Sequence, residues 1–193
     1  ISALVAIFPD EDGNFDIVPY LFVPSAKVEQ RKGGDGVDYQ TWSDQGHLIV
    51  TEGNVQDYNF IQAKYLELAE KFNIISCAFD RWNSSQLIIN LMQENLKFSP
   101  IGMGYISQST PTKYFESLVL DKKINHGGHP VLRWMMSNVS IEEDSAGNIK
   151  LSKKKARDKI DGIAGLIMAI AEYMNTLGDD NDSIYSDRGL IFI

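Results

Sequence analysis

A short, almost wholly apolar segment, Ile74–Phe79, constrains the fold more than any other feature of this 193-residue sequence. Apolar residues that fill consecutive positions, instead of alternating with polar ones, are typical of a strand buried on both faces. Such strands occur in parallel sheets that carry helices on each side. The run stops at Asp80–Asn83. The sequence therefore predicts an α/β fold, with Asp80 at the carboxyl edge of a buried strand.

The rest of the sequence predicts a hairpin at the start of the chain, followed by helices that alternate with strands. Asp10–Asn14 separates two apolar runs, and its Gly13 and Asn14 tolerate the positive φ angles of a hairpin turn. The other expected elements are an irregular connection over 24–56, a helix from the N-cap Asp57 to Asn73, a helix capped by Ser84, a strand over Pro100–Ile106, a helix that starts at Thr110–Pro111, a small hairpin around Asp144–Asn148 and a closing helix from about Ala156 to Leu177. This order is typical of a mixed sheet, an antiparallel hairpin plus parallel strands, flanked by helices. We expect one domain over 1–177 and an acidic, flexible tail over 178–193.

The composition excludes several classes of protein. The single cysteine, Cys77, excludes a disulfide framework and a cysteine-based zinc site. No apolar run approaches the roughly 20 residues that a membrane span needs. With 18 Lys and Arg against 26 Asp and Glu, the formal charge is -8, which by itself argues against a nucleic-acid partner. The chain begins at Ile1, inside a strand-like run and without an initiator Met, so we expect a preceding segment that is absent here.

Asp80 is the first candidate for a functional side chain. It follows a buried strand, and open α/β sheets bind ligands at the carboxyl edge of their strands. An Asx-turn, or a capping role for the helix expected from Ser84, explains Asp80 equally well from its position alone.

Asp161 is the second candidate. It flanks the apolar stripe of the closing helix, which includes Ile160, and Gly162 and Gly165 suggest that this face approaches the sheet closely. Two carboxylates brought together repel each other unless they share a proton or bind a cation. Hard divalent ions such as Mg²⁺ or Mn²⁺ suit oxygen ligands and phosphoryl chemistry. Alternatively, Asp158 and Asp161 are first-turn acids favoured by the helix dipole, which we prefer for Asp158.

Basic residues gather just before Asp161. They are Lys150, Lys153, Lys154, Lys155, Arg157 and Lys159. A run of charges is usually a solvated face, but this run leads into a candidate metal ligand and could hold a phosphate backbone near it. The local field is therefore basic although the total charge is acidic.

Other familiar catalytic patterns are missing from the sequence. The three histidines, His47, His126 and His129, show no paired metal-ligand spacing, and Cys77 has no evident base partner. The glycine-rich stretch Lys32–Gly36 is too short for a nucleotide-binding P-loop and lacks the Lys-Ser/Thr pair. We therefore expect no ATPase site in these residues.

Several segments together resemble the large subunit of tailed-phage terminases. Cys77–Trp82 is similar to the strand that carries that family's second acid, and Lys123–Trp134 resembles its His-Gly-Gly-Asn-Pro-Val-Leu-Arg-Trp block. The closing blocks of the family match at Asn138, Ala146–Ile149 and Lys159–Gly162. The similarity runs from Ile1 to about Leu177. One departure is His129, which stands where the family commonly has Asn, so we transfer no role to it.

The resemblance implies a ribonuclease H-like nuclease that cuts concatemeric viral DNA during genome packaging. It implies two divalent ions, Mg²⁺ or Mn²⁺, held by three acids: Asp80, Asp161 and a first acid on a strand upstream of Ile1. The DNA contacts that we expect are Lys153, Lys154, Lys155, Arg157, Arg81 and Arg133. The implied partners are double-stranded DNA, the portal protein, the small terminase subunit and a packaging ATPase domain in the full-length chain, with no membrane. The implied location is the host cell cytoplasm, transiently at the procapsid portal.

Two other interpretations remain open. The first is a non-catalytic ribonuclease H-like module that docks on DNA or on the portal protein, which the missing first acid allows. The second is another nuclease of the same fold, such as a resolvase or an integrase. The block His126–Trp134 argues against the second interpretation.

Overall fold

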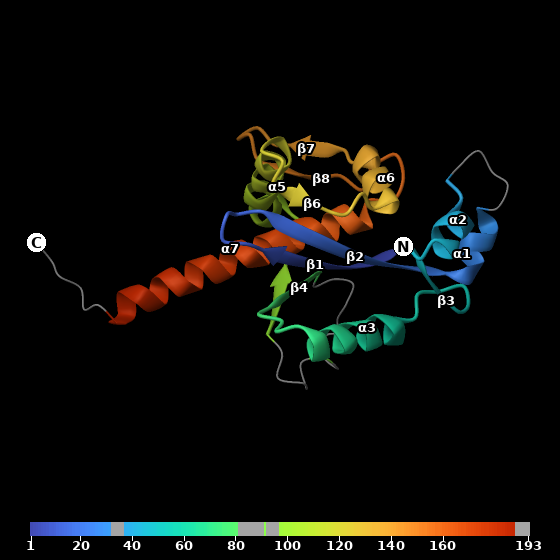
Figure 1. The fold of residues 1–193 in the computed structure, drawn as a ribbon. Helices are drawn as coiled ribbons and strands as arrows, with labels where there is room; N and C mark the ends of the chain where they lie inside the picture. Colours follow the sequence, from blue (N-terminus) through green and yellow to red (C-terminus); the bar gives the residue numbers. More distant parts are fainter. Residues whose placement is uncertain (32–36, 81–90, 92–96, 188–193) are drawn as a thin grey trace, which may run out of the picture.

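A computed structural model describes residues 1–31, 37–80, 91 and 97–187, with side chains described as far as residue 177 (Figure 1). Its main sheet is built on an antiparallel hairpin of β1 (Ser2–Pro9) and β2 (Phe15–Pro24), as the sequence predicts. In the turn, the Asp10 carboxylate accepts hydrogen bonds from the amides of Asp12 and Asn14, at 3.0 and 2.7 Å, and Gly13 has a φ of 76°. Two short strands, β3 (Ile49–Thr51) and β6 (Ile124–Asn125), both pair in parallel with β2.

A second sheet consists of β4 (Cys77–Asp80) and the parallel strand β5 (Phe98–Ile101). Asp80 is the last residue of β4, as predicted. The predicted burial on both faces is wrong, because every side chain of β4 is only partly buried and Ile75 is 67% exposed. The physical reason is that β4 pairs only with β5 among the described strands and that all four of its residues line a cavity. The predicted hairpin near Asn148 is present as β7 (Ile141–Glu143) and β8 (Ile149–Leu151).

The stretch 24–56, where we expected an irregular connection, contains two short helices as well as β3 among its described residues. The helices are α1 (Ser25–Gln30) and α2 (Tyr39–Asp44). Asp38 caps α2 by accepting the amide hydrogen of Gln40, at 2.9 Å. Helices of six residues are too short for apolar periodicity to indicate them. The longer helix α3 (Tyr58–Lys71) begins after Asp57, whose carboxylate accepts from the Asn59 amide, so that predicted cap is confirmed.

Helix α5 (Tyr105–Leu120) starts earlier than predicted and contains Pro111 in its interior. The strand expected over Pro100–Ile106 correspondingly ends at Ile101. A proline usually marks the first turn of a helix, because it lacks an N–H and its ring crowds the preceding turn. Here contacts with β8 hold the turn before Pro111: the Gln108 side chain accepts from the Leu151 amide at 2.9 Å, and Ser109 accepts from Ile149 at 3.2 Å.

The closing helix α7 (Asp161–Asp187) begins at Asp161, after the start that we predicted near Ala156. It also continues through Gly178, where we expected it to end. A helical glycine costs about 1 kcal/mol relative to alanine, which weakens a helix without ending it. The helix expected from Ser84 lies outside the described residues. Whether the tail over 178–193 is flexible stays a prediction.

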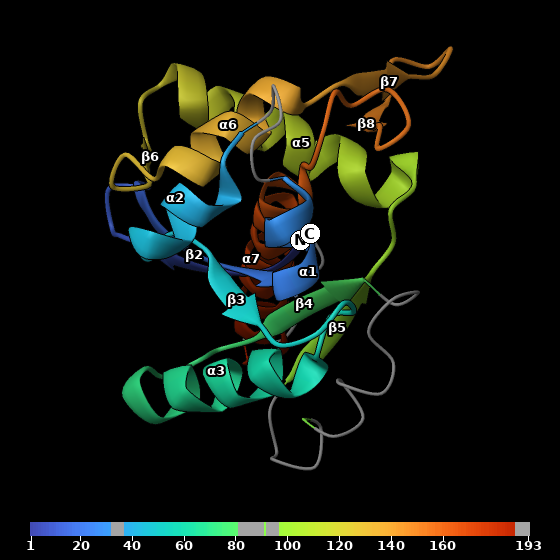
Figure 2. The same cartoon turned by 90° about the vertical axis from the view of Figure 1, so that its right-hand side faces the viewer.

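Helices cover both sides of the strands, as expected for an α/β fold (Figure 2). On one side, inward-facing residues of β2 pack against α5, α6 (Pro130–Asn138) and α7 in the larger core. On the other side, Tyr65 of α3 packs with Phe98 and with Leu4 of β1 in a smaller core. The start of α7 thus belongs to the larger core through Ile163 and Ala164, and β4 packs against the smaller core through Phe79.

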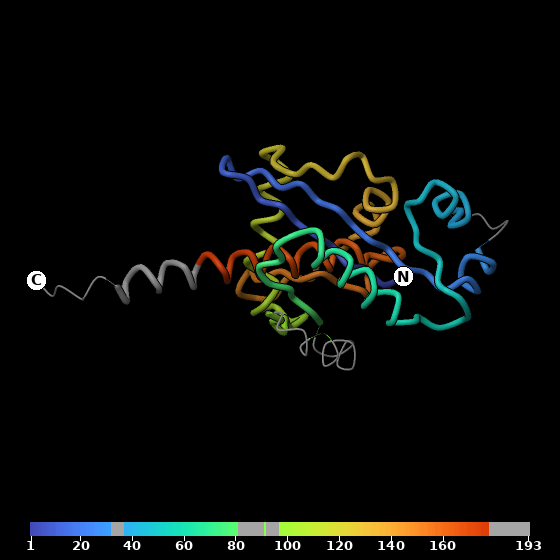
Figure 3. The backbone as a smooth tube through the Cα atoms, turned by 60° about the horizontal axis from the view of Figure 1, so that its bottom comes forward, coloured from blue at the N-terminus to red at the C-terminus, as the bar shows by residue number. Residues whose placement is uncertain are grey.

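Helix α7 runs alongside the β1–β2 hairpin in close contact (Figure 3). A Cβ on Gly162 would stand 2.9 Å from the Met135 sulfur, 3.1 Å from Leu132 and 3.3 Å from Leu21. A Cβ on Gly165 would stand 3.1 Å from a methyl group of Val5. The close approach inferred from the two glycines is therefore confirmed.

We expect Gly162→Ala to destabilise the protein by about 1 kcal/mol net. Overpacking of a filled core costs roughly 1–3 kcal/mol, and the better helix propensity of alanine offsets about 1 kcal/mol of it. Gly165→Ala, which meets one close methyl group, is the matched control and is expected to lie nearer zero. Urea unfolding of each variant and of the parent protein measures the two changes in unfolding free energy. Equal effects of the two substitutions would contradict this account of the contact at Gly162.

His129 caps helix α6. Its Nδ1 accepts the backbone N–H of Leu132 at 3.3 Å, so the neutral ring carries its proton on Nε2. An Asn side-chain oxygen makes the same kind of cap. Burial, followed by repulsion from His47 and His126, lowers the pKa of His129 to about 4. The shared capping role explains how His129 can occupy a position where the family that this sequence resembles commonly has Asn.

The cap predicts a specific loss of stability in acid. An unfolded histidine titrates near pH 6.5, so between pH 6.5 and about 4 only the unfolded chain binds this proton. The contribution of His129 is complete above about pH 6.5 and is lost as the pH falls toward 4. We expect the parent protein to lose more unfolding free energy between pH 7 and pH 5 than His129→Asn, measured by urea unfolding.

At pH 7, His129→Ala should lose about 0.5–2 kcal/mol with the cap, whereas His129→Asn should keep it. The interpretation is wrong if His129→Asn and the parent protein show the same dependence of stability on pH.

Candidate active site

Asp80 and Asp161, which are far apart in the sequence, line one cavity of about 320 Å³. We call it the carboxylate cavity. Its walls are Ser2–Leu4 of β1, Cys77–Asp80 of β4, residues of α3, and Asp161, Ala164, Gly165 and Met168 of α7. It lies between the two sheets, because β1 and β4 do not pair with each other. The structure thus brings the two predicted acids to the same cavity.

The two oxygens of Asp161 have different surroundings. Oδ2 is buried and has no hydrogen-bond partner in the part of the chain that the structure describes. Oδ1 lies 3.9 Å from Nζ of Lys153. A buried carboxylate oxygen without a donor is unfavourable unless a cation or a proton satisfies it. Asp161 therefore fits the role of a ligand for a hard cation, which an oxygen of this kind would coordinate.

The segment before α7 holds Asp161 at the cavity through backbone contacts. The buried side-chain amide of Asn138 donates to the Lys159 carbonyl at 3.2 Å, and the backbone carbonyl of Asn138 accepts from the Arg157 amide at 3.2 Å. Asn138, which matched the resembling family without an assigned role, therefore anchors the start of α7.

Asp158 makes a second anchor. It precedes α7, so our preferred interpretation as a first-turn acid of the helix is wrong. Its carboxylate pairs with Arg31 at 2.8 Å, and this hydrogen bond holds the pKa of Asp158 below its usual value. The Arg31 guanidinium also lies 4.6 Å from the centre of the Tyr39 ring. The pair therefore ties α1 and α2 to the segment that carries Asp161.

The predicted DNA-contacting residues fall into three groups. Lys153, Lys154, Lys155 and Arg157 are exposed, and of these only Lys153 lines the carboxylate cavity. Arg133 is exposed on α6. Arg81 lies outside the described residues. Lys150 is engaged elsewhere, 3.4 Å from Glu142 and 4.7 Å from the centre of the Tyr105 ring.

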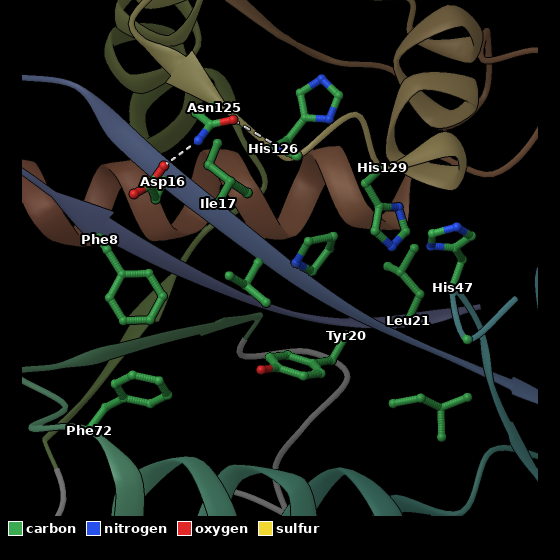
Figure 4. Close-up of a pocket in the computed structure, with 15 residues that line it drawn as sticks. Phe8, Asp16, Ile17, Tyr20, Leu21, His47, Phe72, Asn125, His126 and His129 are labelled. Atoms are coloured by element: carbon green, nitrogen blue, oxygen red, sulfur yellow. Dashed lines mark hydrogen bonds between the residues drawn. The ribbon is translucent and has the colours of Figure 1, made fainter.

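All three histidines line a second cavity, of about 680 Å³, at the edge of β2 (Figure 4). The His47 and His129 rings stand edge to face with their centres 4.9 Å apart, and Nδ1 of His126 is buried without a hydrogen-bond partner among the described residues. Sequence spacing could not indicate this grouping, because His47 comes from a distant segment. The described residues contain no group of three or more His, Cys, Asp or Glu placed to hold a metal ion.

Cys77 has the properties of an unreactive thiol. Burial, with a smaller effect of the Glu172 charge, raises the pKa of Cys77 to about 12. A thiol nucleophile, judged improbable from the sequence, is disfavoured by this environment. No helix within the described ranges is both long enough and apolar enough to cross a bilayer.

Comparison with known proteins places this geometry in a family. Residues 1–176 match the family described as terminase large subunit, endonuclease domain. The large terminase subunit of Enterobacteria phage HK97 is 32% identical over 191 residues, which cover 96% of this chain and 38% of that protein. Protein YmfN of Escherichia coli K12 is 33% identical over 186 residues, which cover 90% of this chain and 39% of that protein. The chain thus spans less than two fifths of either relative.

Two solved structures are similar to the described fold. The crystal structure of the HK97 large terminase superposes with a TM-score of 0.81 at 33% identity, over 88% of this chain and 36% of that chain. The large terminase nuclease of the thermophilic phage G20c superposes with a TM-score of 0.50 at 13% identity, over 62% of this chain and 64% of that chain, and supports the fold alone. The matched range and the identity to the HK97 protein show that this chain belongs to the terminase large subunit endonuclease domain family.

Proposed function

We propose that this domain is a metal-dependent DNA endonuclease that cuts concatemeric viral DNA during phage genome packaging. The observation that carries the proposal is the carboxylate cavity, which Asp80 and Asp161 both line and where one buried oxygen of Asp161 lacks a hydrogen-bond partner among the described residues. Family membership supports a nuclease. The metal requirement and the DNA substrate are part of the proposal.

Asp80 and Asp161 would hold two divalent ions, Mg²⁺ or Mn²⁺. When bound, such ions activate a water molecule and stabilise the leaving oxygen in phosphodiester hydrolysis. The role of the two side chains is to present ligand oxygens at a cavity whose walls come from β1, β4, α3 and α7. A third acid, on a strand outside these 193 residues, stays a prediction from the resemblance.

The shape of the carboxylate cavity supports a complete ribonuclease H-like sheet with one further strand. Within the described ranges, β1 pairs with β2 alone, and β4 pairs with β5 alone. Their other edges both border the cavity. A strand between β1 and β4 would join the two sheets, and an acid on it would lie near Asp80 and Asp161.

Lys153 is the basic residue that we propose to contact the scissile phosphate. Its side chain is 56% exposed, and its ammonium group stands 3.9 Å from the Asp161 carboxylate, whose side chain is 24% exposed, so it can reach a phosphate at the mouth of the cavity. Lys154, Lys155, Arg157 and Arg133, which do not line the cavity, would bind the DNA backbone farther away, and Arg81 stays a predicted DNA contact. The remaining proposed partners are the portal protein, the small terminase subunit and a packaging ATPase domain, in the host cell cytoplasm.

A second candidate function is a non-catalytic module that docks on DNA or on the portal protein. The observation in its favour is that the described residues offer two carboxylates at the cavity and no group of three metal-ligating side chains. The two candidates differ in one measurable property, which is cleavage of DNA that depends on Asp80 and Asp161.

We expect Asp80→Asn and Asp161→Asn to reduce cleavage of plasmid DNA in Mn²⁺ or Mg²⁺ by more than about 100-fold. Loss of outer-shell partners alone commonly costs 10–100-fold, and these residues would be direct ligands. Asp121→Asn, at an exposed helix end, removes the same charge and is the control. Urea unfolding should show that all three variants fold. Parent-like cleavage by either active-site variant would exclude the assignment.

Lys153→Met should lower the cleavage rate roughly tenfold, about 1.4 kcal/mol of barrier, because it removes the lysine beside Asp161 that we propose to contact the phosphate. Lys154→Met is the matched control, since Lys154 is exposed and does not line the cavity. Both substitutions should also reduce the slope of log affinity for DNA against log salt concentration by about 1, because each removes one phosphate contact. A larger loss of cleavage in Lys154→Met than in Lys153→Met would reject this role.

A further inference from the structure

Glu172 is a buried carboxylate that the proposed chemistry does not use. It lies on α7 and is 5% exposed. Its Oε1 accepts the hydroxyl of Ser76, just before β4, and the hydroxyl of Ser99 in β5, the latter at 2.6 Å. Its Oε2 accepts from Asn175 at 3.4 Å. One side chain therefore joins α7 to both strands of the second sheet.

An apolar side chain at position 172 would be enough for α7 to pack against this sheet. A buried charge is unfavourable unless it is hydrogen-bonded, and in return its hydrogen bonds are directional and strong. Two hydroxyls that converge on one oxygen define the position of the helix along the strands and its distance from them. Glu172 thus fixes a register, which apolar contact alone leaves adjustable.

The position of Glu172 relative to the carboxylate cavity gives this register a consequence. Asp161 and Glu172 are about three helical turns apart, so they share one face of α7, roughly 16 Å apart along its axis. Gly165 and Met168, on the same face, line the cavity between them. Ser76 and Asp80 bracket β4 over roughly 13 Å. The chain directions of α7 and β4 are therefore opposed: Glu172 and Ser76 lie at one end of the contact, and Asp161 and Asp80 lie at the other.

We propose that Glu172 is a positioning residue that sets the separation of Asp80 and Asp161 by pinning α7 to β4 and β5. This inference rests on the proposed function. Without the hydrogen bonds of Glu172 to Ser76 and Ser99, α7 can shift along β4, and the two carboxylates no longer present their oxygens at one fixed distance. A metal ion that both must bind is then held less tightly.

The test compares Mn²⁺ binding with stability. Glu172→Met should weaken Mn²⁺ binding, measured by titration calorimetry, by roughly tenfold, and should lower cleavage at saturating Mn²⁺. Glu172→Gln keeps an oxygen that accepts both hydroxyls and should stay within about twofold of the parent protein. Ile167→Val, which trims the opposite face of α7 in the larger core, is the control for a loss of stability alone. Parent-like Mn²⁺ affinity in Glu172→Met would overturn the proposal.

Ser99→Ala covers the case in which Glu172→Met does not fold. It removes the hydroxyl that Ser99 donates to Glu172, and it should weaken Mn²⁺ binding several-fold. An unchanged affinity would count against the positioning role of Glu172. If the parent protein binds no Mn²⁺ that depends on Asp80 and Asp161, the proposed function fails. Amide hydrogen exchange then tests the positioning role of Glu172. Faster exchange at residues 161–165 in Ser99→Ala than in Ile167→Val supports this role, and equal exchange in the two variants rejects it.

Discussion

The close contact between α7 and the β1–β2 hairpin determines where the candidate active-site residues lie. Gly162 and Gly165 let the helix backbone approach Leu21 and Val5 at distances that a Cβ would obstruct. Because Asp161 immediately precedes Gly162, the same contact brings its carboxylate to the cavity beside β4. The anchors around Asn138 and Asp158 then fix the chain as it enters the helix. Backbone packing therefore positions the acid, and side-chain contacts refine its position.

The total charge of -8 is a poor guide to the partner of this domain. Charges farther apart than about 10 Å are largely screened at ordinary ionic strength. The field at the carboxylate cavity is therefore governed by its neighbours, including Lys153 at 3.9 Å from Asp161. Several acids have local structural roles instead, such as Asp10 and Asp144, which hold their hairpin turns through backbone amides. An acidic total is thus compatible with a basic surface where DNA would bind.

Features governed by neighbours in sequence could be predicted, and features that depend on tertiary contacts could not. The hairpin turns, the Asp57 cap, the end of β4 at Asp80 and the buried side of α7 follow local patterns. The start of α5 before Pro111 depends on β8, and the convergence of the three histidines depends on loops that meet only in the folded chain. The same holds for Glu172, whose partners are two serines from separate strands.

The disagreement at β4 is the most informative one. Its apolar sequence is that of a strand buried on both faces with neighbours on both edges, yet its side chains are only partly buried and one edge borders the carboxylate cavity. Local rules that fail at one place often mark a functional or incomplete site. The edge of β1 borders the same cavity. A further strand between them would bury β4 as its sequence requires and would add its own side chains beside Asp80 and Asp161, so packing and chemistry support the same proposal.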